Sequence, residues 1–156
     1  MSASEFKKLF NELAQSHRWL IGHGGWLYPR TDEDQCTVAM ELQKSAYGKL
    51  FYVGINIYID NAFGCVFVSE NSIQDQVATL YRRHPKELDS VFDLTNSLGD
   101  CARKDGVCQF FHFVGELAEI ARTRLGVVDL AGDGKLFMAR GVRTEVDRLT
   151  AANNSW

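Results

Sequence analysis

The chain has little positive charge, few prolines and no long apolar run. Its 17 Lys and Arg residues are outnumbered by 20 Asp and Glu, so the formal net charge is −3 at pH 7. A chain with this balance has no general attraction to nucleic acid or to anionic lipid. No segment is long and apolar enough to span a bilayer, and the first residues lack the parts of a signal peptide. We therefore expect a cytoplasmic protein with no nucleic-acid and no membrane partner.

Cysteine is scarce as well. The four cysteines, Cys36, Cys65, Cys101 and Cys108, lack the dense spacing of a secreted disulfide framework, so we expect reduced thiols. Cys108 and His112 lie four residues apart, with Cys101 upstream, but no second Cys-x-x-Cys completes a zinc-binding set. We predict no metal and no cofactor.

Catalytic motifs are missing from the glycine-rich segments. Residues 22–25 (Gly-His-Gly-Gly) resemble an oxyanion loop, but the chain has no Gly-x-Ser-x-Gly elbow to accompany it. Residues 132–135 lack the spacing of a phosphate-binding loop. We predict no catalytic residue, and we expect a binding protein rather than an enzyme.

What the sequence does contain is one ordinary globular domain. It has 156 residues, of which 46% are hydrophobic, and its two prolines argue against a long disordered tail. We predict an α+β fold over residues 1–156. Residues 1–68 form a helix and an antiparallel sheet of about four or five strands, and residues 69–156 are mainly helical. The N-terminal and C-terminal helices pack mainly on one face of the sheet.

The first part of the chain has clear local signals. Ser2 and Glu5 form a capping box, and apolar residues recur behind them at helical spacing up to about His17. Aromatic segments at residues 18–21 and 26–28 flank the glycine-rich loop, which predicts a hairpin.

The next hairpin is the strongest signal in the chain. Residues 36–45 and 51–59 alternate between apolar and polar side chains, and a turn at Tyr47 and Gly48 joins them. The turn sets a register in which both apolar sets share one face, and a slip by one residue would destroy that match. The predicted apolar pairs are Leu42 with Val53, Met40 with Ile55, and Val38 with Ile57.

The opposite face of this hairpin is the candidate binding face. It carries polar and aromatic side chains around two gaps, at Ala39 and Gly54, which could leave a shallow groove. We expect helices to cover the apolar face only, so that this face stays open. The candidate binding residues are Glu41, Gln43, Tyr52, Asn56 and Tyr58.

The second half of the chain is predicted to be mainly helical. A strand at residues 64–68 precedes a helical stripe from Ile73 to Tyr81, which must end before Pro85. The clearest helix spans residues 109–125, with Gly126 as its C-terminal cap, and we expect it to be the main helix packed on the sheet. A last helix carries Val142, Val146 and Leu149.

The hairpin also carries a family resemblance. Gln43-Lys44-Ser45-x-Tyr47-Gly48, followed by Phe51-Tyr52-Val53-x-Ile55 and preceded by a helix and Gly25-Trp26-x-Tyr28, resembles a bacterial family known only as a domain of unknown function. The resemblance covers roughly the first 60 residues. It implies an N-terminal helix, an antiparallel sheet and C-terminal helices, and it brings no activity to these residues.

Two functions of different classes fit these observations. The first is a protein-binding module of the immunity or regulatory type, with a protein partner or a second copy of the chain; Tyr52, Tyr58, Trp19 and Trp26 are its candidate anchors. The alternative is a small-molecule binder or enzyme that uses the groove, with Glu41 as acid, base or hydrogen-bond acceptor.

Overall fold

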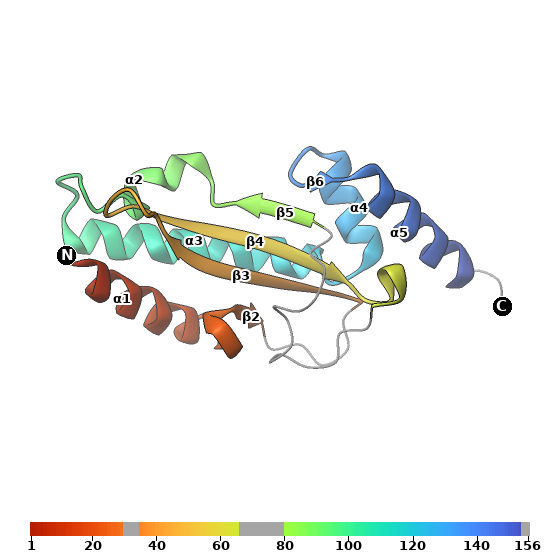
Figure 1. Ribbon diagram of the computed structural model, residues 1–156, viewed down its shortest axis with the longest axis horizontal. Helices are drawn as coiled ribbons and strands as arrows, with labels where there is room; N and C mark the ends of the chain where they lie inside the picture. Colours follow the sequence, from red (N-terminus) through yellow and green to blue (C-terminus); the bar gives the residue numbers. More distant parts are fainter. Residues whose placement is uncertain (30–34, 66–79, 154–156) are drawn as a thin grey trace.

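The structure, a computed structural model, describes residues 1–29, 35–65 and 80–153. Its centre is an antiparallel sheet of six strands that follow one another in sequence order (Figure 1). The predicted α+β class is confirmed, with one or two more strands than the sequence suggested. The strands are β1 Trp19–Ile21, β2 Leu27–Pro29, β3 Cys36–Lys44, β4 Phe51–Ile59, β5 Leu80–Arg83 and β6 Phe137–Met138.

The described helices lie before, after and between these strands. In Figure 1 the long helix α3 runs behind β3 and β4, while α4 and α5 lie at the end of the sheet where β4 ends. The helices are α1 Ala3–Ser16, α2 Asp89–Phe92, α3 Asp100–Ile120, α4 Arg124–Gly132 and α5 Arg140–Asn153, with single 3₁₀ turns η1 His23–Gly25, η2 Ala62–Gly64 and η4 Lys86–Leu88.

The predicted start of α1 is confirmed in detail. The backbone N–H of Glu5 donates to Ser2 Oγ at 3.2 Å, and the backbone N–H of Ser2 donates to Glu5 Oε2 at 2.6 Å. These two bonds satisfy donors that the first turn of a helix leaves free. The helix then buries Phe6, Phe10 and Ala14 along one side.

The β3–β4 register is also confirmed. Leu42 pairs with Val53, and the pairing continues without a slip from Lys44 opposite Phe51 to the other end of both strands. The turn is longer than predicted, because the last backbone bond runs from the N–H of Ser45 to the carbonyl of Leu50 at 2.8 Å. The residues between them still centre on the predicted turn, so the register is unchanged.

The apolar face of this hairpin forms the main core with α1 and α3. Five phenylalanine rings from α1, α2 and α3 pack against one another with centroids 5.0 to 6.4 Å apart, and most pairs are tilted or edge-to-face. The same cluster contains buried residues of β3, β4, α4 and α5, so the long helix packs on the predicted side of the sheet. The five rings belong to Phe6, Phe10, Phe92, Phe110 and Phe111.

A buried arginine fixes the segment between α2 and α3. Arg103 on α3 donates through Nη1 to the carbonyls of Ser90 at 3.2 Å and Asp93 at 3.0 Å, and through Nη2 to Asn96 Oδ1 at 2.9 Å. Its side chain closes the irregular turn onto the helix. A residue that looks solvent-exposed in the sequence is therefore part of the interior.

Two predictions for the middle of the chain are wrong. Leu80 and Tyr81 belong to strand β5 and not to a helix. The rest of that stripe, with Ile73 and Val77, lies outside the described residues. Of the strand predicted at residues 64–68, Gly64 ends a 3₁₀ turn, and residues 66–68 lie outside the described part.

The bounds predicted for the main helix are also wrong. α3 starts at Asp100 and ends at Ile120, and Leu125 belongs to the next helix. Gly126 is no cap of α3, because it lies in the first turn of α4, where its N–H donates to Thr123 Oγ1 at 3.1 Å. A Cβ on Gly126 would lie 1.8 Å from the carbonyl oxygen of Ile120, so glycine permits the tight turn between the two helices.

Two glycines of α3 give opposite predictions for the same substitution. A Cβ on Gly106 would lie 2.3 Å from Val91 Cγ2, whereas one on Gly115 would meet nothing within 4 Å. We expect Gly106→Ala to lower the free energy of unfolding by about 1–3 kcal/mol through overpacking. Gly115→Ala should raise it by about 0.5–1 kcal/mol through helix propensity.

Urea denaturation measures both effects. Because Val91 causes the clash, Gly106→Ala made in a Val91→Ala background should cost much less than in the native chain. Equal effects of Gly106→Ala in the two backgrounds would contradict the packing described for α2 and α3.

Candidate functional site

The candidate binding residues share one face of the sheet, called the open face here. The register places Gln43 beside Tyr52 and Glu41 beside Gly54, as predicted. The buried hydrophobic residues of the described α-helices belong to the core on the other face, and the small cluster on the open face contains no residue of an α-helix. The expectation that helices cover only the apolar side is confirmed for the part of the chain that the structure describes.

The five candidates differ in exposure. Gln43 is exposed, and Glu41, Tyr52 and Asn56 are half-buried. Tyr58 is only 5% exposed and belongs to the small cluster on this face. Burial, followed by the negative charge of Glu41, raises the pKa of the Tyr58 hydroxyl. The Tyr58 side chain is therefore packed inside the protein and is not available for binding. The accessible part of the face lies nearer to the β3–β4 turn.

Tyrosine rings fill both gaps in this face. Ala39 is fully buried in a cluster with Tyr28 and Tyr58. The notch at Gly54 is occupied by the ring of Tyr81, whose Cε2 lies 3.5 Å from the position of a glycine Cβ. The surface around Gly54 is therefore closed by a ring from the neighbouring strand.

Strands β5 and β6 add the residues that sequence reasoning missed. Tyr81 pairs with Asn56 on one side and with Phe137 on the other, and Arg83 pairs with Gly54. Phe137 is 74% exposed and Tyr81 45% exposed. Residues 80–83 read Leu-Tyr-Arg-Arg and do not alternate between apolar and polar side chains, so no local pattern marks Tyr81 and Arg83 as strand residues.

Arg83 joins these side chains into one surface. Its Nε donates to the Tyr81 hydroxyl at 2.9 Å, and its guanidinium carbon lies 5.2 Å from the centre of the Tyr52 ring. Such stacking holds a cation over the face of an aromatic ring. We call Tyr52, Tyr81, Arg83 and Phe137 the aromatic patch.

The face also carries one acidic group near the patch. Glu41 Oε2 accepts a hydrogen bond from Gln43 Nε2 at 2.7 Å. Glu41 and Arg83 both lie opposite Gly54, one on each side of β4. Within the described residues neither charge has an ion-pair partner, so opposite charges stand unpaired on either side of the glycine.

A cavity of about 380 Å³ lies at the edge of the patch. Its most buried polar group is His84, whose side chain is 4% exposed. The ring stacks on Phe92 with centroids 4.4 Å apart, accepts a hydrogen bond from the N–H of Val53 at Nδ1, 3.2 Å away, and places Nε2 2.9 Å from Asp89 Oδ1. The described lining consists of Leu50, Phe51, Tyr52, His84, Asp89, Ser90, Asp93 and Asn96.

These contacts give His84 a structural role. Both ring nitrogens are engaged, so no nitrogen is left to take a proton from a substrate. The ring supplies the acceptor for the N–H of Val53 just beyond the last β4–β5 pair, at Gly54 and Arg83. Burial lowers the pKa of His84, although the hydrogen bond to Asp89 opposes the shift.

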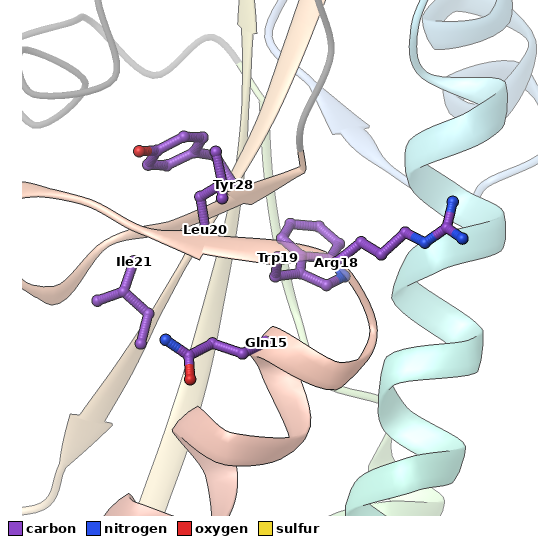
Figure 2. Close-up of a pocket in the computed structure, with 6 residues that line it drawn as sticks. All are labelled: Gln15, Arg18, Trp19, Leu20, Ile21 and Tyr28. Carbon is purple, nitrogen blue, oxygen red and sulfur yellow. The ribbon is translucent and has the colours of Figure 1, made fainter.

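A larger cavity, about 740 Å³, lies where α1 meets the edge strand β1 (Figure 2). Arg18 joins the two elements with a φ of 66°, in the left-handed region that glycine prefers after a helix. In Figure 2 the Arg18 side chain extends toward α3, away from the side chains of Gln15 and Ile21. The described lining consists of Gln15, Arg18, Trp19, Leu20, Ile21 and Tyr28.

The described residues contain neither a membrane-spanning helix nor a cluster of metal ligands. Among the described residues, no helix combines the length and hydrophobicity needed to cross a bilayer. In those residues, no three His, Cys, Asp or Glu side chains gather as a metal site would require. His112 does contact His17, with ring centroids 5.1 Å apart.

Comparisons with protein-family models, with curated proteins and with solved structures found no match for the chain. The resemblance described for the first 60 residues therefore stays a prediction.

His84 predicts a pH dependence of stability. The unfolded chain binds this proton near pH 6.5, whereas the folded protein binds it only at lower pH. The stabilising contribution is therefore complete above pH 6.5 and declines as the pH falls through the lowered pKa. In His84→Asn, the amide oxygen can still accept from Val53 but does not titrate. We expect a melting temperature that falls less between pH 7 and 5 than in the native protein.

His17 needs a separate variant, since burial lowers its pKa in the same direction. His17→Asn should remove only its own share of the pH dependence. A native-like acid loss in His84→Asn would contradict the role assigned to His84.

The left-handed backbone conformation of Arg18 predicts that a glycine at this position would make the protein more stable. A side chain at a left-handed position is strained, and glycine relieves that strain. We expect Arg18→Gly to raise the free energy of unfolding by about 1 kcal/mol. Arg18→Ala keeps the Cβ and should give no such gain. Urea denaturation of the two variants measures the difference, and equal stabilities would show that the backbone is unstrained.

Proposed function

We propose that the protein is a noncatalytic module that binds another protein through its open face. The observation that carries the proposal is the pair formed by Phe137 and Tyr81. Two large aromatic side chains stand side by side in the register, exposed, on the face that the described helices leave uncovered. Exposing them to water is unfavourable, and a partner that covers them would remove that cost.

The chemistry of the patch supports a protein partner. Tyrosine and arginine are enriched among the residues that dominate binding energy at protein interfaces. Tyr81 and Arg83 are held by their mutual hydrogen bond, so little side-chain freedom is left to lose on binding. The patch therefore combines apolar area, a planar cation and partial preorganisation.

The small-molecule alternative has less support at Glu41 and Tyr52. The two gaps that would form a groove are filled by rings of Tyr28, Tyr58 and Tyr81. A small ligand needs a concave site that buries most of its surface. The cavity beside β1 has the size for such a ligand, but it lies away from the candidate residues on β3 and β4.

A cytoplasmic location and a bacterial origin belong to the same proposal. The first is supported by the charge balance and the scarce cysteines, and the second by the resemblance of the β3–β4 hairpin. An immunity-type or regulatory role would fit a small acidic domain whose accessible groups point to binding rather than catalysis.

The proposal predicts that the patch controls association. Phe137→Ser and Tyr81→Ser should each weaken binding by about 2 kcal/mol, roughly 30-fold, because they remove aromatic anchors. Both side chains are exposed, so the free energy of unfolding should change by less than about 1 kcal/mol. Leu125→Ser, which removes a side chain 67% exposed on α4, is the matched control and should have no effect on binding.

Two measurements cover the possible partners. Sedimentation velocity over a range of protein concentrations detects self-association, and affinity capture at physiological salt detects a stoichiometric partner of another kind. The proposal fails if no association of either kind is found, or if the two patch variants associate as strongly as the control.

A further inference from the structure

The charges on the open face are complementary to those of a second, rotated copy of the same face. Glu41 on β3, Gly54 on β4 and Arg83 on β5 lie opposite one another on neighbouring strands, and we call such a set of paired residues a row. The acid and the base are therefore placed symmetrically about β4, with opposite signs. The glycine between them brings no side chain of its own to the centre of the row.

A two-fold axis parallel to β4 would bring the opposite charges of two copies together. Rotation about an axis that lies just above β4 turns a second copy face down and places its β5 over β3 of the first. The rotation leaves each residue at the same position along the strand direction. Arg83 of the second copy therefore lies over Glu41 of the first, and Arg83 of the first lies over Glu41 of the second. The two contacts are equivalent, as an isologous interface requires.

The neighbouring row is compatible with the same rotation. Tyr81 and Phe137 lie in the row of Asn56, together with Ala39. The rotation carries Tyr81 and Phe137 over the β3 and β2 side of the second copy, where Ala39 and Tyr28 are buried in the small apolar cluster. The contacts that this arrangement specifies are therefore the two between Glu41 and Arg83.

The charges also exclude the other simple arrangement. An axis in the plane of the face but perpendicular to the strands would place Glu41 over Glu41 and Arg83 over Arg83 of the second copy. Like charges brought together at an interface oppose association. Sheets that pack face to face lie about 10 Å apart, a gap that an extended Glu and an extended Arg can fill together.

We propose that the partner of the open face is a second copy of this chain, packed face to face about a two-fold axis parallel to β4. The inference rests on the proposed function, since it names the occupant of the same surface. Each dimer contains two Glu41–Arg83 ion pairs between copies, and the aromatic patch of each copy is covered by the other.

Charge reversal gives a decisive test. Glu41→Arg leaves two arginines on the face and Arg83→Glu leaves two glutamates, so each variant alone places like charges in both contacts. We expect self-association of each to weaken about 100-fold or more. In an equimolar mixture every Arg faces a Glu, and the heterodimer should form with near-native affinity. Sedimentation velocity measures affinity, and native mass spectrometry identifies the heterodimer by its mass.

Three controls accompany the test. Lys7→Glu makes the same charge change as Arg83→Glu on the exposed side of α1 and should leave the dimer intact. Glu41→Gln and Arg83→Gln should each weaken association less, and their mixture should recover part of it, because the heterodimer keeps one Glu41–Arg83 ion pair and each homodimer has none. Thermal unfolding of every variant verifies the fold, and the neutral pair replaces the reversed pair if a reversal prevents folding.

Each outcome decides one of the two proposals. Recovery in the reversed mixture supports the dimer. A native protein that stays monomeric, single reversals that still dimerise, or a mixture without recovery each overturn it. If the native protein is monomeric but Phe137→Ser abolishes capture of a different protein, the dimer is wrong and the proposed function stands. If neither kind of association exists, both fail.

Discussion

The register between β3 and β4 is the constraint on which the rest of this protein depends. It puts Val53 and its apolar neighbours toward α1 and α3, and it puts Glu41 and Tyr52 on the opposite side. A shift by one residue would exchange the two sets, since successive side chains of a strand point to opposite faces. The five-ring phenylalanine cluster can form only when the apolar set faces the helices, so core and open face are two results of the same pairing.

The open face and the core are linked in a second way, through His84 and Arg103. His84 ends the β4–β5 pairing and stacks on a ring of the core, and Arg103 holds the turn that carries Asp89 and its neighbours. The edge of the aromatic patch is therefore supported by interior groups. Tyr52 and Arg83 thus lie beside side chains that the core holds in place.

The parts of the fold that follow from local pattern could be predicted, and the parts that follow from distant pairing could not. The capping box of α1 and the β3–β4 register depend on residues close in sequence, and both predictions are confirmed. Strand β5 was predicted as helix because apolar residues before Tyr81 recur at helical spacing, and the two residues of β6 are too few for any period. The start of α3 was hidden by Arg103 and Gly106, which look polar or helix-breaking but are buried by contacts with α2. Of the aromatic patch only Tyr52 was found, because its other three members meet only once β5 and β6 join the sheet.

The order of the six strands bears on how the protein can form during synthesis. Each described strand pairs with the one that precedes it in the chain, so the sheet can grow strand by strand as residues leave the ribosome. α1 and the first four strands lie within the first 59 residues and already contain the two longest strands. The pairing of β3 with β4 is local in sequence, which speeds folding. β6, the last edge, can join only after α3 and α4 have been made, so Phe137 completes the aromatic patch late in synthesis.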